Sequence, residues 1–177
     1  MGIEIPQNKF LILDGAMGTV LQQRGLSPQG RPELLNLTEP ELLDSVYKEY
    51  IAAGSQVIYA NTFGANGLKL AKTGHSVEEV VGAAIAVAKR AAAGTGTLVA
   101  LDVGPLGELL EPMGTLSFER AYDLFREMAE AGAKAGADLI VVETMTDLYE
   151  AKAALLVDAN TGRMVYGCLL YTSPSTR

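Results

Sequence analysis

The chain has 177 residues, of which 49% are hydrophobic, and carries a formal charge of −7 from 21 acidic and 14 basic residues. Its length suits one domain with a sizeable core, and the lack of a basic cluster argues against a nucleic-acid surface, because phosphate contacts require grouped Lys and Arg. One cysteine, Cys168, and one histidine, His75, exclude a disulfide framework and a cysteine-rich metal site within the chain.

The hydrophobic residues occur in short runs rather than in a membrane-length stretch, and no basic leader precedes an apolar segment. We therefore expect a cytoplasmic protein without a membrane anchor. Five apolar runs rich in β-branched residues predict strands: 10–13, 56–61, 98–103, 138–143 and 164–170. Helical periodicity between them gives an alternating βα pattern, which predicts a parallel sheet.

Capping residues mark four predicted helices between these strands. The helices span about 42–53, 76–93, 117–136 and 147–160, and their predicted N-caps are Thr38, Ser76, Ser117 and Asp147. A further helix is expected from about Met17. Each of the first four predicted strands is thus followed by a helix, as in a chain of βα units.

Two architectures fit this alternation. A five-stranded doubly wound sheet is complete at this length, whereas a (β/α)8 TIM barrel typically needs about 250 residues. Four consecutive predicted strands finish in polar residues, namely Asp14, Asn61 with Thr62, Asp102 and Glu143. All strand ends meet at one mouth in a barrel, but only those beside a switch point do so in an open sheet. The polar strand ends therefore favour the barrel.

Each polar residue also has a purely structural interpretation. Asp14 before a glycine suits a turn or an N-cap, Asn61 suits an N-cap, and Asp102 suits an Asx-turn. Glu143 is harder to explain in this way, because Asp147 offers a better cap for the next helix. A carboxylate that ends an apolar strand is costly to bury without a partner, so Glu143 is the strongest indication of a site.

The residue types suit an amino-acid ligand. Asp14 and Glu143 can hold an ammonium group through charge-assisted hydrogen bonds. The backbone N–H groups of a glycine-rich turn at a predicted helix start can hold a carboxylate; this turn contains Gly15, Ala16, Met17, Gly18 and Thr19. It could equally bind phosphate, although GxGxxG and a Walker A lysine are absent, so a doubly wound phosphate-binding enzyme stays an alternative.

Five separated motifs occur in order: LILDGAMGT (11–19), PELLNLTEPELL (32–43), ANTFGAN (60–66), DVGPLGELLEPMG (102–114) and VVETMTDLYEAKAAL (141–155). Together they resemble the homocysteine S-methyltransferase family, which includes cobalamin-dependent methionine synthase and betaine-homocysteine methyltransferase. The resemblance runs from about residue 10 to residue 165, and the bacterial methionine synthase branch is the most similar. It implies a (β/α)8 barrel of which residues 1–165 form roughly the first five strands and four helices, with a divergent tail at 166–177.

The resemblance also implies a substrate and a set of binding residues. The family binds homocysteine and transfers a methyl group to its thiolate, which gives methionine. Asp14 and Glu143 match the carboxylates that hold the substrate amino group, and Asp102 matches a position at the third strand end. The remaining matches are the turn that receives the substrate carboxylate, Gly15 to Thr19, and the pocket wall, Asn61, Thr62 and Phe63.

The family's cofactors are expected outside this chain. Its catalytic zinc is held by three cysteines that follow the sixth and eighth strands and lie beyond Arg177, and Cys168 matches none of them. Cobalamin and methyltetrahydrofolate would act through other domains. We therefore expect this chain alone to be inactive, with a non-catalytic amino-acid-binding role as the alternative. An incomplete barrel leaves an open edge, which predicts instability or self-association.

Overall fold

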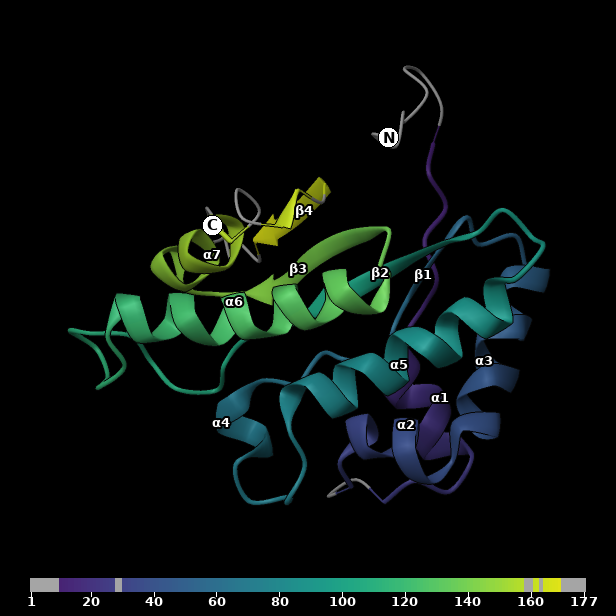
Figure 1. Cartoon of the computed structure of the whole chain (residues 1–177), viewed down its shortest axis with the longest axis horizontal. Helices are drawn as coiled ribbons and strands as arrows, with labels where there is room; N and C mark the ends of the chain where they lie inside the picture. Colours follow the sequence, from purple (N-terminus) through teal and green to yellow (C-terminus); the bar gives the residue numbers. More distant parts are fainter. Residues whose placement is uncertain (1–9, 28–29, 158–160, 163, 170–177) are drawn as a thin grey trace, which may run out of the picture.

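The computed structural model describes residues 10–27, 30–157, 161–162 and 164–169 (Figure 1). Within them, four strands form one parallel sheet whose spatial order is the chain order: β1 (Val57–Tyr59), β2 (Leu98–Val103), β3 (Leu139–Met145) and β4 (Met164–Leu169). A doubly wound sheet reverses its strand order at a switch point, and the described sheet contains no such reversal. The sequential order confirms the barrel-type prediction, and the doubly wound alternative is wrong.

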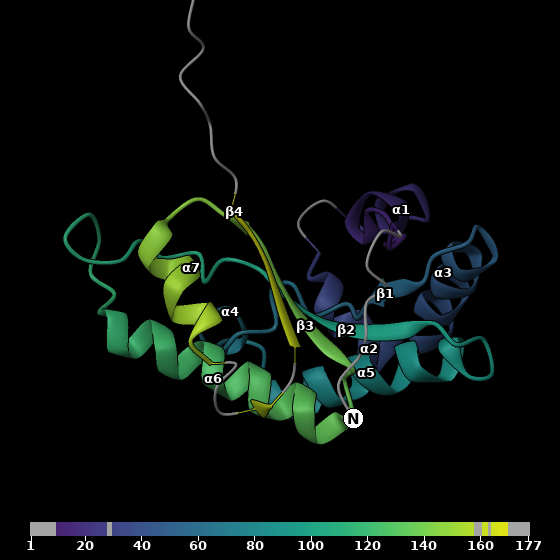
Figure 2. The ribbon, with the colours of Figure 1, turned by 90° about the horizontal axis from the view of Figure 1, so that it is seen from above.

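Helices follow the strands and cover one face of the sheet. In chain order they are α1 (Met17–Gln23), the 3-10 helix η1 (Pro32–Leu34), α2 (Leu35–Thr38), α3 (Pro40–Ala52), α4 (Gly67–Leu70), α5 (Val77–Ala92), α6 (Phe118–Ala135) and α7 (Leu148–Leu155). Figure 2 shows α3, α5, α6 and α7 in succession around the outer side of the curved sheet, and each contacts the next. None of the helices in the described part of the chain combines the length and apolar character that a membrane span requires.

Local capping chemistry sets the start of three long helices. The predicted N-caps of α5, α6 and α7 are confirmed, because each side chain accepts a hydrogen bond from a first-turn backbone N–H; these caps are Ser76, Ser117 and Asp147. α6 ends, as predicted, at Gly136, whose φ of 93° suits a residue without a Cβ. α7 ends at Leu155, before the predicted end, and residues 158–160 lie outside the described part.

Two local predictions are wrong. Thr38 does not cap α3 but ends α2, where its hydroxyl donates to the Leu34 carbonyl at 3.3 Å; this i−4 bond satisfies the side chain within its own turn. The N-cap of α3 is Glu39, without a side-chain cap bond. The predicted strand at 10–13 is reduced to a single bridge between Leu13 and Val57, because the Ile12 N–H donates to the Gln56 side chain and not to a backbone carbonyl.

The last predicted strand corresponds to β4. Its register with β3 continues to the pair Met145 and Leu169, so the predicted tail at 166–177 starts inside a strand, and its residues 170–177 lie outside the described part. Cys168 lies on this strand, as expected for the fifth predicted strand.

The two faces of the sheet bury different sets of residues. Val99, Leu101 and Val103 of β2 belong to the large core between sheet and helices. A smaller cluster on the inner face contains Val57, Ala100, Leu139 and Val141. Because side chains alternate along a strand, Asp102 and Glu143 share this inner face and stand at the carboxyl ends of β2 and β3.

Candidate functional site

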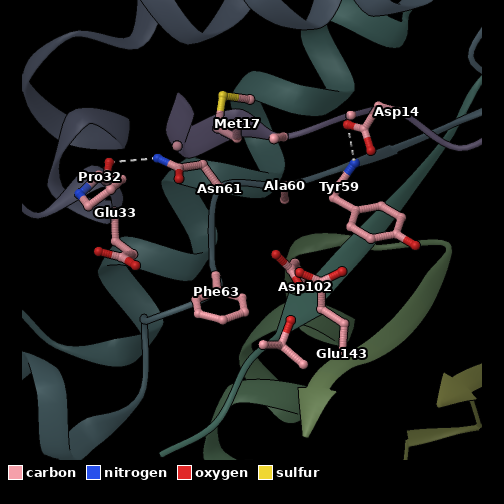
Figure 3. A pocket seen from close by; sticks show the side chains of 14 residues that line it. Asp14, Met17, Pro32, Glu33, Tyr59, Ala60, Asn61, Phe63, Asp102 and Glu143 are labelled. Carbon is pink, nitrogen blue, oxygen red and sulfur yellow. Dashed lines mark hydrogen bonds between the residues drawn. The ribbon is translucent and has the colours of Figure 1, made fainter. Parts of the chain in front are cut away.

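A cavity of about 520 Å³ opens at the carboxyl ends of the strands (Figure 3). Nine of the predicted site residues line it: Asp14, Gly15, Ala16, Met17, Gly18, Asn61, Phe63, Asp102 and Glu143. Thr19 and Thr62 do not. The structure also adds residues that the sequence did not indicate: Pro32, Glu33, Tyr59, Ala60 and Thr144. Segments up to 130 positions apart, from Asp14 to Thr144, therefore meet at one hollow.

Asp14 is held in place by β1. Its Oδ2 accepts a hydrogen bond from the Tyr59 N–H at 2.9 Å, and its own N–H donates to the Val57 carbonyl at 3.0 Å. Burial raises the pKa of Asp14 to about 7, although the Tyr59 bond opposes the shift, and the charge of Glu143 adds to it. The carboxyl group is thus poised to change its charge near neutral pH.

Asp102 is the most deeply buried carboxylate of the cavity. The residue is 8% exposed, and its pKa is raised well above the ordinary value, first by burial and then by the charges of Glu143, Asp14 and Glu33. Thr62 explains how this position is held: its hydroxyl accepts from the Asp102 N–H at 3.0 Å and donates to the Asp102 carbonyl at 2.7 Å. Thr62 is therefore a support behind the cavity wall.

Glu143 reaches the cavity from an irregular part of β3. The register with β4 shifts between Val142 and Met145, and Thr144 has a φ of 60°. Such a bulge re-aims side chains locally, and it recurs next to functional sites. Glu143 is half-buried, which raises its pKa through desolvation, and it points into the cavity beside Asp102 (Figure 3).

The side-chain amide of Asn61 is occupied by the protein itself. Its Nδ2 donates to the Pro32 carbonyl at 2.6 Å, while the Nδ2 of Asn36 donates to the Asn61 carbonyl at 2.8 Å. The buried Tyr47 hydroxyl accepts from the Asn61 N–H at 2.8 Å. These bonds tie the end of β1 to η1 and hold the Pro32 and Glu33 wall in place.

Phe63 forms an apolar part of the wall between two close neighbours. The ring packs so tightly over Gly104 that a Cβ there would meet ring carbons at 2.5 to 2.7 Å. On another side the Lys69 ammonium lies 5.4 Å from the ring centroid, and it also donates to the Pro105 carbonyl at 2.8 Å. Gly104 in the DVGPLG motif is thus explained by the close approach of Phe63.

Glu33 and Tyr59 were not indicated by the sequence. Glu33 follows a proline ahead of an apolar-periodic stretch, where an acidic residue is ordinary helix-start chemistry; in the structure its Oε1 accepts from the Gly64 N–H at 2.8 Å. Tyr59 belongs to an apolar strand run. The available signal was its position two residues after Val57, which places both side chains on the inner face of the sheet.

The described lining of the cavity is acidic and includes no basic side chain. Four carboxyl groups face the cavity, those of Asp14, Glu33, Asp102 and Glu143, and the described lining residues include no Lys, Arg or His. His75 is elsewhere, with its Nδ1 3.0 Å from an oxygen of Glu79. In the described part of the chain, no group of three His, Cys, Asp or Glu side chains could hold a metal ion. The site therefore suits an organic cation, and its residues do not fit a zinc ion.

Comparisons with known proteins relate this chain to one family. A family model described as homocysteine S-methyltransferase matches residues 11–175. Methionine synthases from Mycobacterium tuberculosis and Mycobacterium leprae are 32% and 31% identical over alignments of 169 positions, each of which covers 87% of this chain and 14% of the relative. The homocysteine methyltransferase MmuM from Escherichia coli superposes with a TM-score of 0.79 in its oxidized form and 0.78 in its metallated form, at 27% and 26% identity. The chain covers 62% and 64% of those two structures, which in turn match 91% and 93% of it.

Proposed function

Because the chain belongs to the homocysteine S-methyltransferase family, we propose that its cavity binds homocysteine as the substrate of a methyl transfer that gives methionine. One observation carries the proposal: the described lining of the cavity has carboxyl groups but no Lys, Arg or His side chain, and the Gly15 to Gly18 turn forms one of its walls. Asp14 and Glu143 receive the ammonium of the ligand, and the backbone N–H groups of the turn receive its carboxylate. Asn61 and Phe63 shape the wall, and Thr62 supports it.

The transfer itself requires groups beyond those described. The thiolate sulfur attacks the methyl carbon, a new S–C bond forms, and the bond from carbon to the donor breaks. The family resemblance assigns thiol activation to zinc, and the described residues do not form such a site. We therefore propose that this chain binds homocysteine without transferring a methyl group. Measured turnover by the chain alone would contradict this.

The remaining cofactors and partners are proposals from the resemblance. Cobalamin and methyltetrahydrofolate would serve through parts of the protein that correspond to the other 86% of the methionine synthases, of which this chain matches 14%. The domain division at residue 165 and the self-association through the open barrel edge belong to the same proposal. An amino-acid-binding role without catalysis is the second candidate, and the lack of a metal-binding group among the described residues favours it for the chain alone.

Titration calorimetry of the chain with homocysteine tests the proposed function. We expect binding that does not depend on added zinc and that Glu143→Gln weakens about 10-fold, because a neutral amide oxygen replaces a charged acceptor and the hydrogen bond to the ammonium loses its charge assistance. Glu130→Gln, on the exposed surface of α6, is the matched control and should bind as the unsubstituted chain does. A folded chain that binds no homocysteine would contradict the proposal.

A further inference from the structure

Asp102 carries an unused hydrogen-bonding atom in the cavity. Its Oδ1 is buried and has no partner among the described residues, although the residue lines the cavity and is 8% exposed. Leaving a buried acceptor unsatisfied costs about 1–3 kcal/mol. Such an atom is completed by a water, an ion or a ligand, and the place of Asp102 in the cavity lining favours a ligand donor.

The position of Asp102 relative to the other carboxylates limits what the donor can be. Asp14 stands beside β1, Asp102 ends β2, and Glu143 ends β3, so the three carboxyl groups come from successive positions along the sheet. Figure 3 shows the Asp102 and Glu143 carboxyl groups together, across the cavity floor from Asp14. The two backbone bonds of Asp102 to Thr62 keep its side chain from moving away with the strand.

A primary ammonium has three N–H donors and no acceptor, and the described lining residues supply no competing cation. We infer that Asp102 is the third acceptor of the ammonium site, so that the cavity selects ligands with a primary, unalkylated amino group. The inference rests on the proposed binding of homocysteine and adds a specificity that Asp14 and Glu143 alone would not provide, since two acceptors are satisfied equally well by a secondary ammonium.

The protonation of Asp102 is compatible with this role. Burial, and after it the charges of Glu143, Asp14 and Glu33, raise its pKa well above the ordinary value, which favours the neutral form. A neutral carboxyl group keeps a carbonyl oxygen as an acceptor and gains a hydroxyl donor, which the neighbouring carboxylates can accept. Asparagine has the same arrangement of one acceptor and one donor group, so it should replace Asp102 in the ligand contact.

The test compares homocysteine with N-methylhomocysteine by titration calorimetry, in metal-free buffer, on the unsubstituted chain and on two variants. We expect the unsubstituted chain to prefer homocysteine by about 10- to 100-fold, as for one hydrogen bond to a charged group. Asp102→Asn should retain this preference. Asp102→Ala should weaken homocysteine binding by a similar factor but change N-methylhomocysteine binding little. The ratio of the two affinities should therefore fall towards one.

The ratio of the two affinities separates a ligand contact from a structural role. If Asp102 only supports the fold, Asp102→Ala weakens both ligands together, and an unchanged ratio overturns the inference. Equal affinities of the unsubstituted chain for both ligands also overturn it. Thermal unfolding by circular dichroism checks each variant, and Asp102→Val, which keeps a branched side chain, replaces the alanine variant if that one does not fold. No binding of homocysteine to the unsubstituted chain would instead contradict the proposed function itself.

Discussion

Asp14 shows how a buried acid can be made ready for a cation at the expense of stability. Its pKa is raised from 3.8 to about 7, mainly by burial. Between these values the folded chain holds a proton that the unfolded chain has released, so the free energy of unfolding falls as the pH rises from about 4 to about 7. Above pH 7 the penalty of a buried charge without a cation is complete. A bound ammonium would remove that penalty, which links binding to the ionised form.

We predict that Asp14→Asn stabilises the ligand-free chain at pH 8 and has little effect at pH 4. A shift of this size corresponds to about 4 kcal/mol at full ionisation, so a gain of roughly 2–4 kcal/mol is expected. The asparagine oxygen can still accept from the Tyr59 N–H, which preserves the contact with β1. Urea denaturation at the two pH values measures the effect.

The exposed carboxylate variant Glu130→Gln is the control for this comparison, and its effect should differ little between the two pH values, because the exposed ion pair of Glu130 with Arg126 contributes little to stability. A loss of stability in Asp14→Asn at pH 8 would contradict the prediction, because it would show that the ionised carboxylate has a stabilising partner in the ligand-free chain.

At the scale of elements, the distance between helix and sheet depends on small residues. Gly132 of α6 faces Leu101 of β2, and a Cβ on Gly132 would meet the Leu101 side chain at 2.8 to 3.2 Å. Leu101 is fully buried, so it has little room to move. Gly82, in the middle of α5, has no atom near the place of a Cβ. The same residue type therefore has a packing role in one helix and none in the other.

We predict opposite effects of alanine at these two glycines. Gly82→Ala should stabilise the chain by about 0.5–1 kcal/mol, because alanine loses less backbone entropy in a helix. Gly132→Ala should destabilise it by about 1–3 kcal/mol through overpacking against β2. Thermal unfolding of both variants gives the comparison. A stabilising Gly132→Ala would show that α6 can move away from the sheet without loss.

At the scale of the whole molecule, an apolar surface extends from α7 to the sheet edge. It surrounds a cavity of about 400 Å³ whose lining includes Val142, Leu148, Leu155, Leu156 and Gly167. Leu148 is 67% exposed and Leu156 47%. Apolar side chains grouped in this way favour contact with another surface, and they lie beside the outer edge of β4, which pairs with no other strand of the described residues. This is the physical basis of the proposed self-association.

We predict that the chain self-associates in a concentration-dependent manner and that the double substitution Leu148→Glu and Leu155→Glu weakens this association. Charges on α7 would have to be desolvated in the contact. Sedimentation velocity over a range of concentrations measures the effect. Ala86→Glu, at an exposed position of α5, is the control. A chain that is monomeric at every concentration would contradict the prediction.

The parts of this protein that local chemistry decides were predictable from the sequence. Strand runs, helix periodicity and the caps Ser76, Ser117 and Asp147 depend on residues within about four positions of each other. The polar residues at strand ends indicated a common mouth, and the cavity brings Asp14, Asp102 and Glu143 to it. The family follows from the order of several motifs along the chain.

Other features depend on contacts between residues that are distant in sequence. The side-chain amide of Asn61 donates a hydrogen bond to the Pro32 carbonyl, 29 positions away, and the Glu33 carboxylate accepts one from the Gly64 N–H, 31 positions away. The segment at 10–13 has strand-forming residues but forms only one bridge, because the Ile12 N–H donates to the Gln56 side chain, 44 positions away, and not to a backbone carbonyl. Local sequence thus accounts for most of the helices and strands, for their order and for the carboxylates available for a cation. Which of these carboxylates share one cavity, and which atom is left without a partner, depends on the folded chain, because burial and hydrogen-bond satisfaction are properties of its packing.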